Sequence, residues 1–184
     1  NKVSVDNCII KDCSVNGVYL NNSEFGSFTA NTISDCEEYP LVIPFLQATA
    51  VTSDNEISGI GICLTGGNVG KKNGKVTVHE QTIPYVFGNG QWCFEINDNA
   101  EVTIEPGVTI AMPEDCFIRV GYSTSGKLTA VGTEEKPITF TSNLTDKAAG
   151  DWQGIYFDQY SSKSSALKNC HIEYAGGGDY GAVE

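Results

Sequence analysis

The sequence predicts an all-β solenoid, a chain that coils in one direction with three short parallel strands in each turn. Three strings of the form Asn-x-Ile begin at Asn7, Asn31 and Asn55, at intervals of 24 residues. A period in the twenties is typical of proteins built from stacked structural units. Two further observations agree: short alternating runs of β-branched and aromatic residues recur, and no stretch has the sustained spacing of an amphipathic helix.

The expected strands are about three residues long, and Gly, Pro, Asn or Ser residues bound most of them. They lie at 18–20, 41–43, 62–64, 102–104, 108–110, 118–120, 138–140 and 155–157.

Equivalent positions advance along the chain in three series. In the first part, one series holds Ile9, Ile33 and Ile57, and another holds Val18, Leu41 and Ile62. In the second part, the pairs are Phe94 with Ile118, Val102 with Leu128, and Val108 with Ile138, at intervals of 24, 26 and 30. We therefore expect each strand to stack on its equivalent about 4.8 Å away in the next turn. Hairpins reverse direction and would not keep three series in step.

The 184 residues are expected to form one domain. Residues 65–91, rich in Gly and Asn, are interpreted as an irregular join between two segments of one coil. The step from Ile118 to Ile155 is 37 residues, which indicates an inserted loop at 142–151. Because neither end has the polar cap that a solenoid needs, the sequence also predicts a fragment of a longer chain.

Alternation along each strand predicts which side chains fill the coil. Ile118, Val120, Ile155 and Phe157 are expected inside, and Arg119, Tyr156 and Asp158 outside. Asn7, Asn31 and Asn55 are expected to turn inward and satisfy backbone groups, although three unrelated surface turns are the alternative. Cys13 and Cys36 share a position in successive turns, but stacked parallel side chains seldom offer the torsion of roughly 90° that a disulfide prefers.

Two other folds are alternatives to a β-solenoid. A leucine-rich repeat has an overlapping period, but seven leucines cannot supply its Leu-x-x-Leu-x-Leu strands. A β-sandwich stays open as an alternative.

One string of residues resembles a known fold: Val102–Ile110, Gly126–Thr133, Pro137–Ser142, Gly150–Ile155 and Leu167–Gly176. It is similar to the right-handed parallel β-helices of secreted and surface proteins of bacteria. The resemblance implies an extracellular or cell-surface setting, often adhesive or related to polysaccharides. It implies no single activity, because this fold carries lyases, hydrolases, adhesins and inert stalks alike.

Charge and hydropathy exclude two classes of partner. The formal charge is -12 with 11 basic residues, and such a surface repels nucleic acid. It also disfavours acidic polysaccharides unless a cation bridges the two. No apolar run approaches the roughly 18 residues of a membrane span, so no membrane insertion is expected.

The sequence offers few catalytic groups. His79 falls in the irregular join and is expected at the surface, and His171 is expected to face outward beside Glu173. No catalytic residue, metal ligand or cofactor is assigned. Calcium stays open because the chain has 23 carboxylates, but no D-x-D-x-D-G loop holds them.

The best candidate for binding is a surface around Arg119. Tyr156 is expected one turn away on the same outer face, with Asp158, Asp151 and Trp152 nearby. A ring, a guanidinium and carboxylates in this arrangement can form a shelf for a sugar. In the alternative, Arg119 makes a cross-strand ion pair and Trp152 anchors the inserted loop.

A second surface is apolar: Tyr19, Val42 and Cys63 are expected to form an outward stripe. Such a stripe usually contacts something. The segment Lys75–Phe87 could fold over it, or a partner could bind there.

Together these patterns predict a non-catalytic extracellular scaffold for adhesion or glycan contact on a bacterial surface. Its partner would be an extended glycan or a surface protein, contacted by side chains displayed on a stiff ladder. The alternative is a polysaccharide lyase or glycosidase with catalytic turns partly outside this segment.

Overall fold

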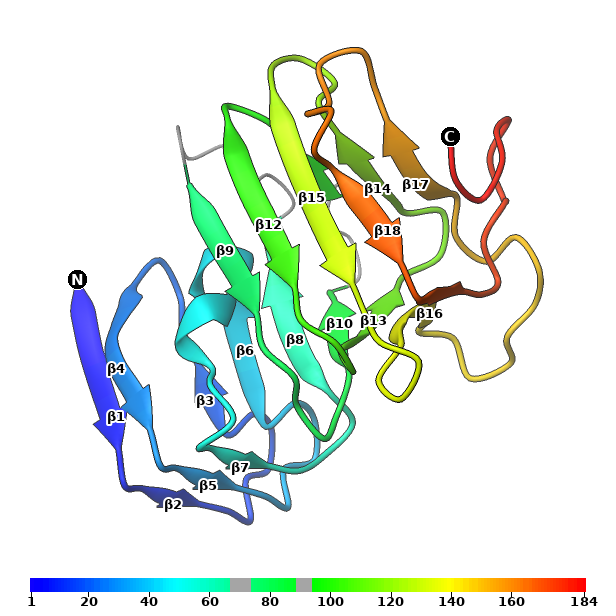
Figure 1. Cartoon of the computed structure of the whole chain (residues 1–184). Helices are drawn as coiled ribbons and strands as arrows, with labels where there is room; N and C mark the ends of the chain where they lie inside the picture. Colours follow the sequence, from blue (N-terminus) through cyan, green and yellow to red (C-terminus); the bar gives the residue numbers. More distant parts are fainter. Residues whose placement is uncertain (67–73, 89–93) are drawn as a thin grey trace.

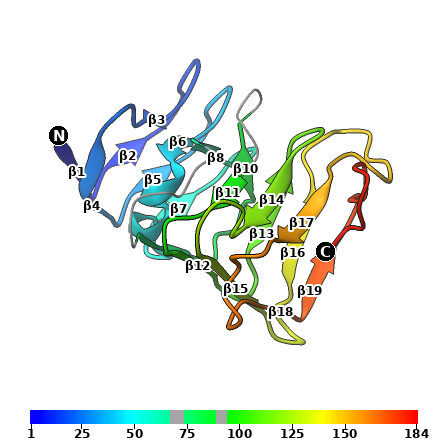
Figure 2. The ribbon, with the colours of Figure 1, turned by 90° about the horizontal axis from the view of Figure 1, so that it is seen from above.

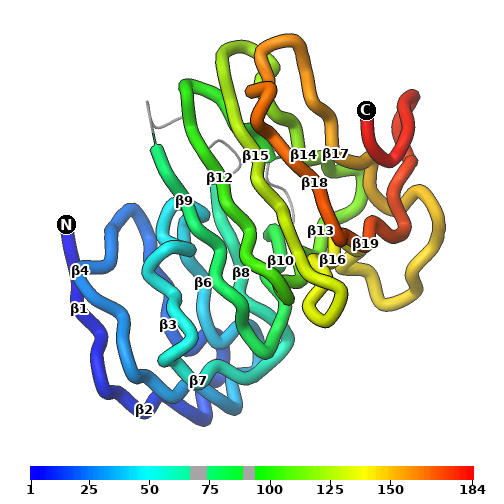
Figure 3. The backbone as a smooth tube through the Cα atoms, in the orientation of Figure 1, coloured from blue at the N-terminus to red at the C-terminus, as the bar shows by residue number. Residues whose placement is uncertain are grey.

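The computed structural model describes residues 1–66, 74–88 and 94–184. Over these residues the chain winds into a parallel β-helix whose successive turns lie side by side (Figures 1 and 3). Every strand pair among the described residues is parallel. The predicted all-β parallel coil is therefore confirmed.

Three short strands make up most turns. The first turns contain β1 (Lys2–Asp6), β2 (Ile9–Ile10), β3 (Val18–Tyr19), β4 (Glu24–Thr29), β5 (Thr32–Ile33), β6 (Leu41–Pro44), the 3₁₀ helix η1 (Phe45–Ala50), β7 (Glu56–Ile57) and β8 (Ile62–Thr65). The later turns contain β9 (Lys75–Val78), β10 (Tyr85–Phe87), β11 (Phe94–Ile96), β12 (Ala100–Ile104), β13 (Thr109–Met112), β14 (Phe117–Val120), β15 (Gly126–Val131), β16 (Ile138–Ser142), β17 (Gly154–Phe157), β18 (Ala166–Lys168) and β19 (Cys170–Ile172). No described helix is long and apolar enough to cross a membrane.

The strands form five parallel sheets, and one of them runs almost the full length of the coil. This long sheet has the order β19-β16-β13-β10-β8-β6-β3. The others are β1-β4, the corner sheet β2-β5-β7, the sheet β18-β15-β12-β9, and the β14 sheet β11-β14-β17. The helix η1 contacts both β4 and β9, and so lies between β1-β4 and the four-stranded sheet.

The cross-section of the coil changes along its length. In the first turns the corner sheet precedes the long sheet in each turn, whereas in the later turns the β14 sheet follows it. The two ends of the stack are well separated in both views (Figures 1 and 2). The corner sheet and the β14 sheet therefore belong to different parts of the molecule.

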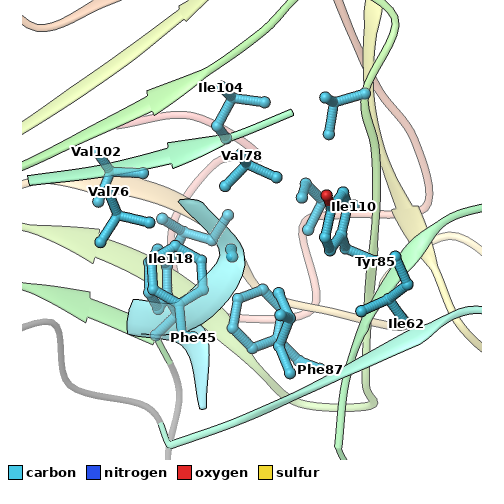
Figure 4. Packing of buried hydrophobic residues seen from close by; sticks show 14 of the residues in the cluster. Phe45, Ile62, Val76, Val78, Tyr85, Phe87, Val102, Ile104, Ile110 and Ile118 are labelled. Carbon is cyan, nitrogen blue, oxygen red and sulfur yellow. The ribbon is translucent and has the colours of Figure 1, made fainter. Parts of the chain in front are cut away.

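Apolar side chains from all sides fill the interior. Ile62, Val76, Val102 and Ile118 are at most 2% exposed. Where the cross-section changes, Phe45 of η1 reaches inward, and its ring centroid is 4.5 Å from that of Phe94. Figure 4 shows Phe45 beside Phe87 and Ile118 in this packing.

The predicted register is confirmed in most series. Val18 pairs with Leu41 and Leu41 with Ile62. In the later turns, the strands pair as predicted around Ile118–Ile155, Val102–Leu128 and Thr109–Thr139. The long step to Ile155 does contain a segment without strands, between β16 and β17, where the inserted loop was expected.

The Asn-x-Ile series is wrong in its first member. Ile33 pairs with Ile10 rather than Ile9, and Ile9 is 76% exposed. The reason is the length of the turn: Thr32 pairs with Ile9 at an interval of 23 residues but with Glu56 at an interval of 24. Asn7 therefore lies at the position equivalent to Ala30, and both residues take a left-handed backbone conformation, with φ of 54° and 52°. Cys8 takes the position stacked on Asn31, and its N–H donates to Asn31 Oδ1 at 3.0 Å.

The other two asparagines stack as predicted. Asn31 and Asn55 are buried, and Asn31 Nδ2 donates to Asn55 Oδ1 at 3.0 Å. Asn31 Nδ2 also donates to the Val5 carbonyl, and Asn55 Nδ2 to the Phe28 carbonyl. The two side chains thus join three successive turns from inside the coil.

Two expectations about residues 65–91 change. Part of this range is regular, since β9 and β10 lie within it and β10 pairs with both β8 and β13; residues 67–73 and 89–91 lie outside the described residues. Lys75–Phe87 therefore does not fold over the apolar stripe. In that stripe Val42 and Cys63 are only 4% and 6% exposed, while Tyr19 is 61% exposed.

The cysteines described by the structure are free thiols. The backbones of Cys13 and Cys36 pair as an isolated parallel β-bridge between successive turns, as their spacing predicted. Burial, followed by the side-chain hydrogen bond with Cys13, raises the pKa of the Cys36 thiol to about 11.

Candidate functional site

The outer face of the β14 sheet carries the candidate site. Its three strands are in register, so that Glu95, Arg119 and Tyr156 occupy equivalent positions in successive turns. Ile118 and Val120 on either side of Arg119 are buried, which forces the guanidinium onto the outer face. The sequence prediction that Arg119 and Tyr156 are neighbours is confirmed.

Aromatic rings surround the Arg119 guanidinium. Its central carbon lies 4.3 Å from the centroid of Tyr122, 5.1 Å from that of Phe117 and 6.0 Å from that of Tyr156. A cation over an aromatic face is attracted by the ring quadrupole, and the planar guanidinium stacks on such faces. The rings therefore hold the Arg119 side chain along the sheet.

Asp158 forms an ion pair with Arg119. Its Oδ2 lies 3.0 Å from Arg119 Nε, and both side chains are about three-quarters buried. The contact is an ion pair without hydrogen-bond alignment, because neither atom has a hydrogen-bond partner among the described residues. Asp158 thus compensates the charge of Arg119 at close range.

Tyr156 is less accessible than the sequence predicted. Although it faces outward, it is only 4% exposed, and its ring packs edge-on against Tyr180 with centroids 5.7 Å apart. Burial is the main cause that raises the pKa of the Tyr156 hydroxyl, and the nearby Glu184 carboxylate adds to it. This hydroxyl is also buried without a hydrogen-bond partner among the described residues.

Two other tyrosines supply the exposed rings. Tyr122 is 51% exposed and Tyr180 is 56% exposed. We call the whole cluster the arginine–aromatic shelf: it consists of Phe117, Arg119, Tyr122, Tyr156, Asp158 and Tyr180.

Two residues predicted for this surface have other contacts. Trp152 is fully buried, and its Nε1 donates to the Glu173 carbonyl at 2.8 Å. Its ring cannot stack on a ligand, because it anchors the end of the inserted loop to the next turn. Asp151 Oδ2 accepts a hydrogen bond from the Ala148 N–H at 3.1 Å, within that loop.

The histidines lie apart from the shelf. His79, expected at the surface, is half-buried, and its Nδ1 lies 3.0 Å from Glu105 Oε1. His171 is exposed, and no ion pair joins it to Glu173, whose carboxylate instead accepts a hydrogen bond from Thr141. Among the described residues, no three His, Cys, Asp or Glu side chains gather in a way that could hold a metal ion.

Sequence reasoning missed Phe117, Tyr122 and Tyr180. Phe117 and Tyr122 lie within three residues of Arg119 in the sequence. Tyr180 does not occupy the position equivalent to Tyr156, because Ile155 pairs with Val183 at an interval of 28 residues and the equivalent position is therefore Glu184. The spacing along the chain thus gives no signal for Tyr180. Nothing in the sequence indicates that Tyr122, beyond the end of β14, folds back over the guanidinium.

The shelf combines two exposed rings, a held guanidinium and a carboxylate. Aromatic faces pack against the C–H faces of sugar rings, and the charged groups can hydrogen-bond hydroxyls. Fold and site together define a parallel β-helix protein that presents an arginine–aromatic surface on one of its sheets.

Comparison with known proteins agrees with the fold. A family model described as a pectate-lyase-like β-helix domain matches residues 70–178, which is more than half of the chain. The chain belongs to this pectate-lyase-like β-helix family. No curated protein and no solved structure matches it. The family relates the fold to carbohydrate, and the shelf lies within the matched residues except for Tyr180.

Proposed function

We propose that this β-helix is a non-catalytic scaffold that contacts glycans through the arginine–aromatic shelf. The observation that carries the proposal is the placement of two half-exposed tyrosine rings on one surface: Tyr122 lies against the Arg119 guanidinium, and Tyr180 packs against Tyr156. A side chain held before binding loses little further entropy when a ligand arrives. The rigid ladder beneath the shelf supports the same reasoning.

One polar atom at the shelf also supports a polar ligand. Arg119 Nε and Asp158 Oδ2 face each other in the ion pair, whereas Tyr156 Oη has no hydrogen-bond partner among the described residues. Buried polar groups without partners are rare in folded proteins, and a water or ligand group commonly satisfies them.

The charges favour a neutral glycan over an acidic one. Asp158 pairs with Arg119, Glu95 occupies the equivalent position one turn away, and Glu184 is close enough to act on Tyr156. Carboxylates thus outnumber the single guanidinium, and the whole chain carries a formal charge of -12. A polyuronate would be repelled by this surface unless cations screened it.

The proposed setting is extracellular, on or released from a bacterial surface, in an adhesive role. It rests on the resemblance of the chain to secreted and surface β-helices and on its membership of a carbohydrate-related family. Surface proteins are the other partner class that a stiff ladder of this kind would suit.

A second candidate function, polysaccharide cleavage, is favoured by the family description alone. Turnover would need an acid or base free to move a proton at the bond that is cut. Arg119 is instead held by Asp158 and three rings. We therefore rank cleavage below binding.

The test is a glycan array followed by titration of the best ligand. Replacing Tyr122 with Ala removes an exposed ring, so affinity should fall about tenfold, the worth of one good aromatic contact. Tyr19→Ala is the matched control, because Tyr19 is also an exposed tyrosine but lies on the long sheet. Equal affinities for the two variants would contradict the proposal.

The same panel of polysaccharides separates binding from cleavage. Incubation with the wild type should yield no new reducing ends or unsaturated products. Turnover that disappears in Arg119→Ala and Asp158→Ala would favour the enzyme instead.

A further inference from the structure

A groove of about 530 Å³ opens on the side of the coil, beside β7. It is formed where the corner sheet stops. The connection through the corner spans residues 51–61 in the turn that contains β7, but only 79–84 in the next turn and 105–108 in the one after. The later corners are too short to place a strand beside β7. This strand is therefore the last of the corner sheet, and its outer edge has no neighbouring strand (Figure 1).

Hydrogen bonds hold the two walls of the groove together. Thr82 Oγ1 donates to the Ile57 carbonyl at 3.2 Å, and Gln81 Nε2 donates to the Val51 carbonyl at 3.1 Å. Glu80 forms an ion pair with Lys136. The wall opposite β7 consists of residues 80–82, and their side chains fix it in place. This wall occupies the position at which a further strand of the corner sheet would have paired.

The lining is polar at the rim and apolar at the base. Ser53, Glu56 and Ser58 are exposed on the β7 side, while Ile57 is 3% exposed beneath them. The Glu56 carboxylate has no ion-pair partner among the described residues. Hydroxyls and a free carboxylate around an apolar base suit a ligand with one C–H face and several hydroxyl groups.

The charges of the lining narrow the ligand class. None of its described residues is Lys or Arg, and Lys136, which contacts the lining residue Glu80, is already paired with that carboxylate. An anionic ligand would therefore find no counter-ion in the lining, and no described cluster suits a metal ion. An extended peptide added to the edge of β7 would need main-chain acceptors. The Ile57 carbonyl already accepts the Thr82 hydrogen bond, which disfavours that occupant.

We propose that this groove, the corner groove, is a second binding site for one or a few units of a neutral saccharide. It is separate from the arginine–aromatic shelf, since it lies on the corner sheet rather than on the β14 sheet. A volume of about 530 Å³ falls within the usual range of small-ligand sites, about 300–1,000 Å³. The proposal goes beyond glycan contact at the shelf and does not depend on it.

The experiment is a titration of the isotope-labelled full chain, followed through its backbone amide signals in solution. The probes are cellotetraose, mannotetraose and chitotetraose, with tetragalacturonate as the acidic comparison and a hexathreonine peptide as the extended-chain comparison. One neutral tetrasaccharide should shift the amides of residues 53–58 and 80–82 saturably. Tetragalacturonate should bind at least about tenfold more weakly, because the lining offers it no cation.

Variants locate the binding. Ser58→Trp should fill the groove and abolish these shifts. Glu56→Gln keeps the shape and removes the charge, so it should weaken binding about three- to tenfold, the worth of one exposed charge-assisted hydrogen bond. Tyr122→Ala, at the shelf, should leave groove binding unchanged.

Four outcomes would overturn the proposal. These are no shift at 53–58 with any neutral tetrasaccharide at about 10 mM, tighter binding of the hexapeptide, undiminished binding in a folded Ser58→Trp variant, or equal affinity in Glu56→Gln. Amides of residues 117–122 report on the shelf in the same spectra, so failure at one site is distinguishable from failure at the other.

Discussion

The buried asparagine pair gives the sharpest test of how the turns are held together. Asn55 is 5% exposed, and its side chain makes five hydrogen bonds, one of them only to the adjacent Asp54 at 3.3 Å. Its Oδ1 accepts from the N–H of Asn31 at 3.1 Å and from Asn31 Nδ2 at 3.0 Å. Its Nδ2 donates to the carbonyls of Phe28 and Thr52, each at 3.1 Å.

Asn55→Ala should lower the free energy of unfolding by about 3–5 kcal/mol. Each lost hydrogen bond costs about 1 kcal/mol net, and more where the partner stays buried and unsatisfied. The partners left behind are a backbone N–H, two carbonyls and one amide hydrogen of Asn31. Urea denaturation, followed by circular dichroism, measures the change. With a slope of about 2–3 kcal/mol per molar urea, the midpoint should fall by about 1–2.5 M.

Asn7→Gly is the matched control. Asn7 begins the same Asn-x-Ile pattern, but it is exposed and has a positive φ that glycine also tolerates. Its replacement should change the stability by less than about 0.5 kcal/mol. If Asn55→Ala were as mild as Asn7→Gly, the buried amides would not be what joins the turns, and the reasoning would be wrong.

Two further predictions concern packing and thiol chemistry. Gly126→Ala should destabilise the fold by at least about 3 kcal/mol in the same urea assay, because the new methyl group would collide with the Ile96 carbonyl oxygen of the preceding turn. Gly26→Ala is the control: its methyl group would approach only the movable Ser4 hydroxyl closely, so it should cost less than about 1 kcal/mol. Cys36, whose pKa is raised to about 11, should react with iodoacetamide at pH 8 about two orders of magnitude more slowly in the folded protein than in urea, where an ordinary thiol pKa near 8.5 returns. Below its pKa the Cys36 thiol is mostly protonated, so the rate of alkylation of the folded protein should rise about tenfold per pH unit up to about pH 11. Peptide mass mapping measures this rate. An alkylation rate that is the same in the folded and unfolded protein would contradict the burial argument.

Much of the coil could be predicted because its geometry is local and periodic. The alternation around Ile118 and Ile155 placed Arg119 and Tyr156 outside, and the parallel register then made them neighbours. The interval of 37 residues predicted an inserted loop at 142–151 for a similar reason, since the ladder on either side must stay in step, and no strand lies between β16 and β17. The Asn7 position failed because the first turn is one residue shorter than the next, with intervals of 23 and 24 residues, and the sequence motif gives no sign of that difference.

The site was predicted less completely than the coil. Alternation decides the face of a strand residue but not its final exposure, so Tyr156 was correctly oriented yet proves to be covered, with Tyr180 packed against it. Trp152 was placed near the shelf by sequence proximity, whereas its indole N–H turns inward to the Glu173 carbonyl. Loop residues such as Tyr122 follow no period, and their packing depends on the neighbouring turn.

The amino-acid sequence by itself determined that the strands stack in parallel, which apolar side chains point into the coil, and that Arg119 points outward. These features depend only on side-chain alternation and a repeating interval. The tertiary structure alone decided which rings close around that guanidinium and where the corner sheet ends. Both depend on contacts between turns and on the length of each corner. Those contacts join residues far apart in the chain, and no local pattern encodes them.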